Sequence, residues 1–147
     1  EKTAGSTQPM IGKTVIDYGC GSGVLAIACL LLGAEHAWAV DIDEQALQAS
    51  QENARINGVQ DRLSIGLPES VRAQSADLVM ANILFKPLMD LADALALCVK
   101  PSGELIVSGI LESQSSPLRM RYNGDFEFSG TQTMDGWVML SASRRLV

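Results

Sequence analysis

Three glycines within five residues, Gly19, Gly21 and Gly23, directly follow a short β-branched run at residues 14–17. The apolar run that comes next, residues 24–32, predicts a helix that the following glycine ends. Glycine permits backbone angles that other residues avoid, and it removes side chains that would block a close ligand. The sequence therefore predicts a strand, a glycine loop and a helix, with a ligand-binding backbone at the loop.

Strand and helix signals continue to alternate along the chain, which is typical of an α/β fold. Asp43 is placed to cap a helix that runs to about Ile56, and Asn57-Gly58 is expected to terminate it. Asp135-Gly136 predicts a hairpin turn. Strands are expected at residues 14–17, 37–42, 63–67, 76–82, 104–110, 126–133 and 137–143, and further helices from residue 84 or 87 to 99 and at residues 113–122.

Length and composition indicate one globular domain, because the chain has 147 residues, of which 47% are hydrophobic and 19% are charged. The longest apolar stretch, residues 24–32, is too short to cross a bilayer, so no membrane association is expected. Residues 1–11 carry no secretion signal and are expected to form a disordered or linker segment. The cytoplasm is the expected location, and a monomer is favoured because nothing demands a partner chain.

Charge and cysteine content exclude several kinds of function. The net charge is −6 and the 11 basic residues are scattered, so no direct binding of nucleic acid is expected. An acidic surface would favour encounter with a basic protein. Cys20, Cys29 and Cys98 form no CxxC pair, so we expect neither a disulfide framework nor a metal site. Cys29 and Cys98 are expected to be core thiols.

The glycine loop, residues 19–23, is predicted to bind a nucleotide-like cofactor, since ligands of open α/β sheets lie beyond the carboxyl ends of the strands. Asp41 follows 18 residues after Gly23, at the end of the next strand, where a carboxylate can accept hydrogen bonds from two ribose hydroxyls. Its neighbour Ile42 can cover an adenine face. These features alone suit both a nicotinamide dinucleotide and S-adenosylmethionine.

The spacing of the glycines favours S-adenosylmethionine. The loop has the pattern GxGxG rather than the dinucleotide pattern GxGxxG, and position 24 is Val. The run from Asp17 to Gly23 resembles a methyltransferase signature, in which the leading acid and the loop backbone hold the methionine part of the cofactor. The expected cofactor-binding residues are Asp17, Gly19, Cys20, Gly21, Gly23, Asp41, Ile42 and Asn82.

Asn82 ends the fourth expected strand, and the resemblance to methyltransferases implies that the group facing the methyl acceptor lies there. Methylation of an amine requires a free nitrogen lone pair in line with the methyl–sulfur bond, so a neutral acceptor oxygen at Asn82 would orient the amine. A carboxylate would instead favour the ammonium form. We expect Asn82 to be catalytic and Ile83, Leu84 and Phe85 to face the substrate, whereas His36 lies away from the predicted site.

Several segments together resemble the ribosomal protein L11 methyltransferase family: residues 14–33, 41–58 and 108–111, and especially Asn82-Ile83-Leu84 followed by Pro87-Leu88. Five βα units followed by a hairpin likewise resemble the class I methyltransferase fold. The resemblance implies a doubly wound, Rossmann-like sheet of seven mostly parallel strands with a C-terminal antiparallel hairpin. It also implies methyl transfer from S-adenosylmethionine, which becomes S-adenosylhomocysteine, to lysine and N-terminal amines of a ribosomal protein.

Two departures from the family pattern keep other functions open. Phe85-Lys86 stands where the family usually has a small pair, and this bulk could narrow or redirect the acceptor channel. The family's N-terminal recognition domain and cofactor-covering segment are not in this sequence, so we expect an excised catalytic domain. The alternatives are a methyltransferase for another protein or a small-molecule amine, a cofactor-binding module without turnover, and, least favoured, a nicotinamide-dependent oxidoreductase.

Overall fold

The computed structural model describes residues 10–146, which fall into two compact units that divide between Val71 and Arg72. Of the segment expected to be a linker, residues 1–9 lie outside the described residues. Its last residue, Ile11, forms an isolated antiparallel bridge with Ala34. No helix between residues 10 and 146 is long and apolar enough to span a membrane.

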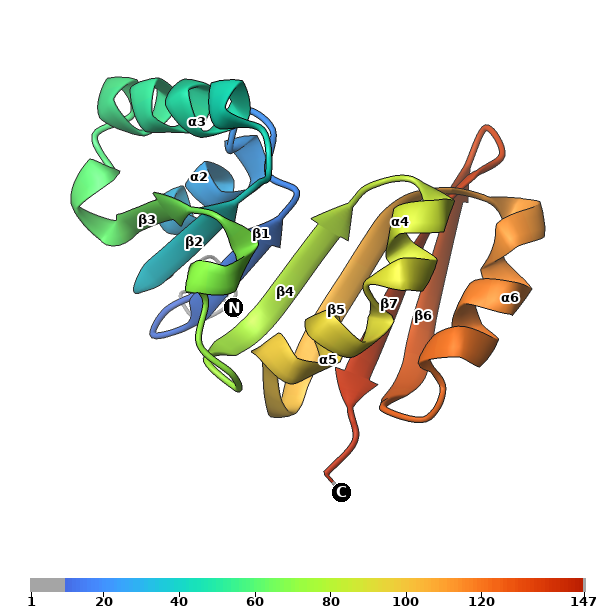
Figure 1. The fold of residues 1–147 in the computed structure, drawn as a ribbon. Helices are drawn as coiled ribbons and strands as arrows, with labels where there is room; N and C mark the ends of the chain where they lie inside the picture. The colour runs from blue at the N-terminus through green and yellow to red at the C-terminus, as the bar shows by residue number, and fades with distance from the viewer. Residues whose placement is uncertain (1–9, 147) are drawn as a thin grey trace, which may run out of the picture. The chain divides into compact units, whose positions relative to one another are not determined.

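The first unit contains a parallel three-stranded sheet in the order β3-β2-β1. The helices α2 and α3, which contact each other, pack against this sheet (Figure 1). The sheet is apolar where it is covered, since Val15, Ile16, Ala37 and Ala39 are fully buried. The elements are β1 (Thr14–Tyr18), α2 (Val24–Leu31), β2 (His36–Val40), α3 (Glu44–Ile56), β3 (Leu63–Gly66) and the 3₁₀ turns η1 (Gln60–Arg62) and η2 (Pro68–Ser70).

The second unit contains four strands in the order β4-β5-β7-β6, with β4 parallel to β5 and the last two pairs antiparallel. The helices α5 and α6 pack on this sheet, and α4 packs against these two helices (Figure 1). Asp135 and Gly136 both have positive φ in the hairpin between β6 and β7, as the Asp-Gly pair predicts. The elements are β4 (Ala76–Asn82), α4 (Phe85–Asp90), α5 (Ala92–Cys98), β5 (Val99–Leu111), α6 (Glu112–Tyr122), β6 (Phe126–Met134) and β7 (Trp137–Arg144).

Most expected elements are present, but the single helix expected after residue 84 is wrong. It is divided into α4 and α5 at Leu91, whose φ of −94° and ψ of 6° leave the helical region. No glycine or proline marks this break, so the sequence carries no local signal for it. The strand expected at residues 104–110 is longer than predicted, because β5 spans Val99–Leu111, and its register shifts between Ala76 and Leu78 of the neighbouring strand.

Two further expectations need correction in the first unit. The sequence predicts a second strand that continues to Ile42, but β2 ends at Val40, so Asp41 and Ile42 lie beyond the strand rather than within it. The expectation of five βα units is also wrong, because β3 is followed by the 3₁₀ turn η2 and no α-helix. Pro68 begins that turn, and proline is well suited to a first helical position.

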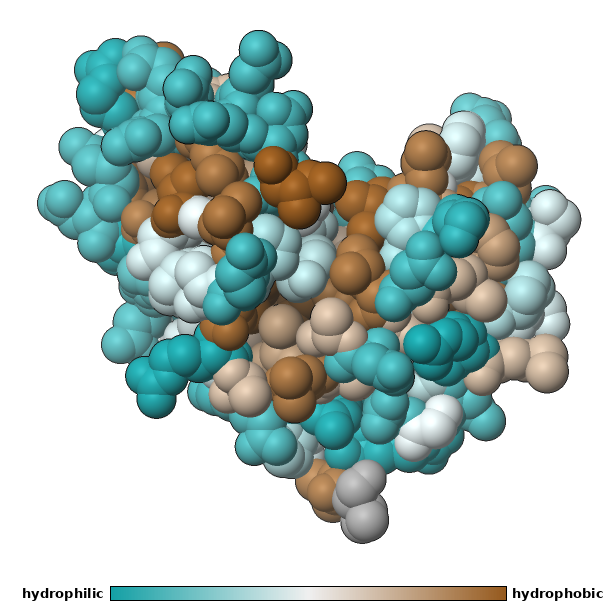
Figure 2. Space-filling model, viewed as in Figure 1, coloured by the Kyte–Doolittle hydropathy of each residue, from teal (hydrophilic) through white to brown (hydrophobic). Residues whose placement is uncertain are grey.

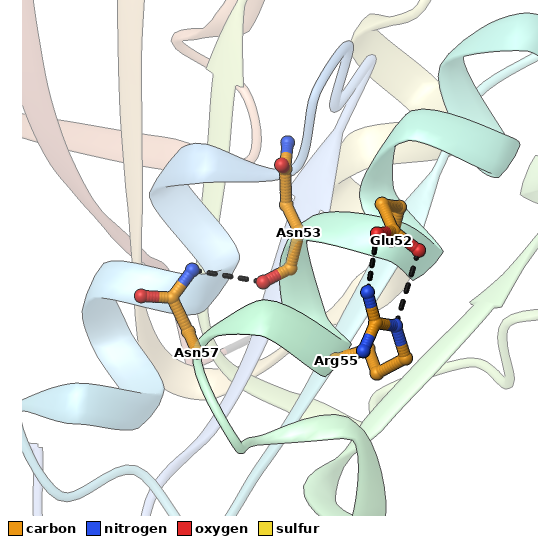
Figure 3. Close-up of polar contacts among 4 residues, drawn as sticks. All are labelled: Glu52, Asn53, Arg55 and Asn57. Atoms are coloured by element: carbon orange, nitrogen blue, oxygen red, sulfur yellow. Dashed lines mark hydrogen bonds and ion pairs between the residues drawn. The ribbon is translucent and has the colours of Figure 1, made fainter.

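Helix α3 shows how local sequence sets its boundaries. Asp43 accepts a hydrogen bond from the Gln45 amide at 3.0 Å, which caps the N-terminus as expected. Near the C-terminus, the exposed ion pair between Glu52 and Arg55 lies along the helix (Figure 3). Hydrophilic side chains gather over α3 in Figure 2. The exposed Glu52–Arg55 pair contributes little to stability. The packed inner face of α3 is therefore what holds this helix to the sheet.

The contacts of the three cysteines and of His36 indicate structural roles. All three cysteines are buried and none is in a disulfide, which confirms Cys29 and Cys98 as core thiols. No group of side chains between residues 10 and 146 has the composition of a metal site.

His36 is the first residue of β2. Its Nε2 lies 2.8 Å from the Ser64 hydroxyl, and its ring packs edge-on to Trp38. Its neighbours therefore give it a role in joining β2 to β3.

Candidate functional site

The glycine loop connects the end of β1 to the start of α2 and crosses the carboxyl end of β2. The amides of Gly19 and Cys20 both donate to the Val40 carbonyl, at 2.8 and 3.0 Å. The φ angles of Gly19, Gly21 and Gly23 are +76°, +55° and +79°, which only glycine adopts readily. The three glycines are therefore required by the path of the chain, in addition to any ligand.

Asp41, which directly follows β2, is hydrogen-bonded to the glycine loop. Its Oδ2 accepts a hydrogen bond from the Gly21 amide and its Oδ1 accepts one from the Asp43 amide, both at 3.0 Å. The neighbouring Ile42 side chain is 84% exposed, which leaves it available to cover a ligand. Each carboxylate oxygen can accept a second hydrogen bond. Asp41 can therefore support the loop and still accept hydrogen bonds from a ligand's hydroxyl groups.

Asp17 is buried beneath the loop, with 2% of its surface exposed. Its Oδ2 accepts a hydrogen bond from the Ala26 amide at 3.1 Å, so it satisfies a free amide in the first turn of α2. Burial raises the pKa of the Asp17 carboxyl to about 7, an effect that the Ala26 hydrogen bond opposes and the negative charge of Asp41 reinforces. Asp17 therefore stabilises the junction between the loop and the first turn of α2.

The raised pKa of Asp17 predicts a stability that falls as pH rises. Below the unfolded pKa of 3.8 the carboxyl is protonated in both states, and its contribution is fully present. Between pH 3.8 and about 7 only the folded state keeps the proton, so the contribution is lost progressively, by up to about 4 kcal/mol. Urea unfolding at pH 5, 6, 7 and 8 should show this slope, and Asp17→Asn should flatten it. Parallel curves for parent and variant would contradict the burial argument.

Ser50 and Asn53 of α3 also contact the loop, and neither is among the residues predicted from the sequence. Ser50 is fully buried, and its hydroxyl donates to the Gly21 carbonyl at 2.9 Å. Asn53 donates from Nδ2 to the Ser22 carbonyl at 3.0 Å. A signal was present, because Leu47, Ser50 and Ala54 have helical spacing on the inner face and only one of them is polar.

Cys20 contributes its backbone to the candidate site, whereas its side chain packs inside. Its side chain is buried, and the sulfur lies 3.4 Å from the Ser50 hydroxyl. Burial raises the pKa of the Cys20 thiol, which keeps it neutral near pH 7. Gly23 packs closely against the same serine, since a Cβ at Gly23 would lie 2.8 Å from Ser50 Oγ. The thiol and the serine therefore fill the space between the loop and α3.

In the second unit, Asn82 is the exposed last residue of β4. Its Oδ1 accepts a hydrogen bond from the Ser108 hydroxyl of β5 at 3.1 Å. The adjacent Gly109 has a φ of +93°, and a Cβ there would lie 3.0 Å from Asn82 Oδ1 and 2.7 Å from the Ile83 carbonyl oxygen. Ser108 and Gly109 therefore set the orientation of the Asn82 carboxamide, and a second lone pair of its oxygen can accept from a substrate.

A cavity of about 500 Å³ in the second unit contains Asn82. The β6–β7 hairpin contributes most of the other residues, among them the exposed Met134 and Trp137. From the sequence, this hairpin is predicted only as an element of the sheet. The lining residues of the cavity are Asn82, Ser108, Gly109, Gln132, Thr133, Met134, Trp137, Val138 and Met139.

The three expected substrate-facing residues follow Asn82 and lead into α4. Ile83 is partly exposed, Leu84 is 68% exposed at the N-terminal end of α4, and Phe85 begins the helix. Lys86 pairs with Asp90 at 3.2 Å on the exposed side of α4. None of the three lines the cavity around Asn82, so their contact with a substrate stays a prediction.

The structure thus brings together seven of the eight expected cofactor-binding residues in the first unit. These are Asp17, Gly19, Cys20, Gly21, Gly23, Asp41 and Ile42. Asn82 belongs to the second unit, where Ser108 and Gly109 surround it. Its role in binding the cofactor stays a prediction.

Comparison with known proteins gives a consistent family match. The model of the family described as ribosomal protein L11 methyltransferase (PrmA) matches residues 6–145. A protein named ribosomal protein L11 methyltransferase from Azotobacter vinelandii is 50% identical over 139 residues, which cover 94% of this chain and 48% of that protein. The chain spans about half the length of the curated relatives it matches.

Solved structures agree with the family match and confirm the predicted fold class. The ribosomal protein L11 methylase of Lactobacillus delbrueckii subsp. bulgaricus has a TM-score of 0.84 at 33% identity, over 91% of this chain and 71% of that one. An RNA methyltransferase of Salinibacter ruber in complex with S-adenosyl-L-homocysteine has a TM-score of 0.74, over 96% of this chain and 87% of that one. Its identity is 15%, so it shows the fold alone.

Proposed function

Because this chain belongs to the ribosomal protein L11 methyltransferase family, we propose that it binds S-adenosylmethionine and transfers its methyl group to protein amines. The proposed acceptors are lysine and N-terminal amines of ribosomal protein L11 or a similar protein. The proposed location is the cytoplasm. The arrangement of the glycine loop and Asp41 carries this proposal, since both sit at the carboxyl ends of parallel strands.

The residues of the first unit fit such a cofactor. Nothing lies within 4 Å of a Cβ built on Gly21, so a ligand has open space beside the loop. Asp41 offers carboxylate oxygens for ribose hydroxyls, and the exposed Ile42 offers an apolar surface for adenine. When bound, the cofactor supplies a methyl group on a positively charged sulfur. The loop and Asp41 would bind and orient it.

In the second unit, Asn82 would orient the acceptor amine. Its Oδ1, held by Ser108, can accept a hydrogen bond from a neutral amine and so direct the nitrogen lone pair. Transfer would form the N–C bond and break the C–S bond of the bound cofactor, and S-adenosylhomocysteine would leave as the product. The amine proton must pass to water, because a free lysine amine holds its proton to about pH 10.4.

Calorimetric titration with S-adenosylmethionine, S-adenosylhomocysteine and a nicotinamide dinucleotide tests the cofactor. We expect both sulfur compounds to bind and the dinucleotide not to bind. Incubation with methyl-labelled S-adenosylmethionine and purified ribosomal protein L11, followed by mass spectrometry, then tests transfer. Binding without transfer would favour a module without turnover for this chain. Binding of the dinucleotide alone would overturn the proposal.

Replacement of Asp41 by Ala should weaken binding of S-adenosylhomocysteine by about 10- to 30-fold. A hydrogen bond to a charged group contributes at least about 1.5 kcal/mol, and the variant also loses the link from Asp41 to the Gly21 amide. Calorimetry with the parent chain as reference measures the change. Asp43→Ser is the matched control, because serine keeps the cap of α3 and should change the affinity less than twofold. Equal losses in both variants would argue against a ribose-binding role for Asp41.

A further inference from the structure

Helix α3 holds the glycine loop through two side chains one turn apart. The Ser50 hydroxyl donates to the Gly21 carbonyl at 2.9 Å, and Asn53 Nδ2 donates to the Ser22 carbonyl at 3.0 Å. Asn53 points away from the exposed Glu52–Arg55 pair in Figure 3. Ser50 and Asp17 are the two buried polar side chains among residues 10–146, and both contact the loop or the helix that follows it.

These contacts decide which way the loop peptides face. In a planar trans peptide the C=O and the following N–H point in opposite directions, so a carbonyl held toward α3 turns that N–H away from it. The Gly21 carbonyl points to Ser50, and the Ser22 amide therefore points away from α3. The Gly21 amide is itself held by Asp41 Oδ2. Without such partners, peptides flanked by glycine can rotate at little energetic cost.

We propose that Ser50 and Asn53 are positioning residues for the amino-acid end of the cofactor, an inference that rests on the proposed function. Ser50 holds the Gly21 carbonyl against α3, so that the Ser22 N–H faces the carboxylate of the ligand. Asn53 holds the Ser22 carbonyl in the same way and fixes the adjoining peptide, whose Gly23 N–H donates to the Cys20 carbonyl at 2.9 Å. A rotated peptide would present a carbonyl oxygen and repel that carboxylate. Both residues act through the loop backbone, whereas Asp41 acts on the ribose.

The test compares two ligands that differ at the amino-acid end. S-adenosylhomocysteine has this end, and 5′-methylthioadenosine lacks it but keeps the ribose and adenine. We expect Ser50→Ala and Asn53→Ala each to weaken S-adenosylhomocysteine about tenfold while changing 5′-methylthioadenosine less than twofold. Asp41→Ala should weaken both ligands. Asn53→Asp should be worse than Asn53→Ala, since its carboxylate cannot donate to the Ser22 carbonyl.

Two control variants on α3 separate positioning from general damage. Ala54 is 1% exposed, so Ala54→Gly should destabilise the helix without altering either affinity. Arg55→Ala removes an exposed ion pair and should leave both stability and affinity nearly unchanged. Asn53 is only partly buried, so Asn53→Ala gives a folded variant even if Ser50→Ala unfolds the chain.

The outcomes separate this inference from the proposed function. Loss confined to S-adenosylhomocysteine in the Ser50 and Asn53 variants supports the positioning role. Equal loss for both ligands, or no loss, overturns it while the proposed function stands. A parent chain that binds neither ligand overturns the proposed function and this inference with it. Affinity loss in Ala54→Gly equal to that in Asn53→Ala would reduce the effect to helix stability and overturn the inference.

Discussion

Replacing Asn82 by Asp should lower the rate of methyl transfer about 100-fold. The carboxylate would favour the protonated ammonium form of the acceptor, which has no lone pair to attack the methyl group. Misplacement of a reacting group costs rates of this order, and the added charge changes both the protonation state and the orientation of the amine. The measurement is the initial rate of label transfer to ribosomal protein L11 at saturating S-adenosylmethionine, with the parent chain as reference.

A raised pH distinguishes this explanation from a simple loss of folding. If the carboxylate introduced by Asn82→Asp acts by holding the proton on the amine, the variant should recover part of its rate as pH rises from about 7 to about 9. Asn123→Asp is the matched control, because it makes the same chemical change at the end of α6 and keeps an oxygen for Arg145. A variant at Asn82 that retains full rate would remove this residue from the acceptor site.

Replacing Gly23 by Ala should lower the free energy of unfolding by about 2–4 kcal/mol. An alanine at a φ of +79° costs about 1 kcal/mol, and its Cβ would lie 2.8 Å from Ser50 Oγ and 2.9 Å from Ser50 Cβ. Ser50 is fully buried, so it has no free space into which it can move. Urea denaturation followed by tryptophan fluorescence measures the change.

Gly58→Ala provides the matched control for backbone strain. Gly58 has a φ of +71°, close to that of Gly23, but nothing lies within 4 Å of a Cβ built there. We therefore expect a loss of only about 1 kcal/mol, the cost of the left-handed conformation alone. The difference between the two variants measures the steric contact with Ser50. Equal losses would show that the close contact between Gly23 and Ser50 does not affect the free energy of unfolding.

Local signals accounted for most of the fold. The helix α3 begins and ends where Asp43 and Asn57-Gly58 place its boundaries, and β4 covers the expected residues. The break at Leu91 was not predictable, because its conformation lacks a glycine or proline signal. Arg144 of β7 donates to the carbonyls of Ala96 and Val99 at the end of α5, a contact between residues far apart in the sequence that no local pattern indicates.

The candidate site was predictable where the backbone itself imposes a residue type. The positive φ angles of the loop require glycine. Asp41 and Asn82 could be placed because each lies at the carboxyl end of an expected strand. The supporting residues were not predictable because their roles depend on which partner the fold brings near them. The role of Asp17 in holding the cofactor stays a prediction, and the structure adds that its carboxylate accepts a hydrogen bond from the Ala26 amide and supports α2.

The sequence by itself determined the alternation of strands and helices, the path of the glycine loop and the family to which the chain belongs. The first two properties follow from periodicity and backbone sterics, which act over a few residues, and the family follows from the similarity of residues 6–145 to its model. Only the tertiary structure decided that Ser50 and Asn53 hold the loop and that Ser108 and Gly109 surround Asn82. The physical reason is that a hydrogen bond or a close contact needs both partners in place, and the packing of α3 and β5 sets that distance.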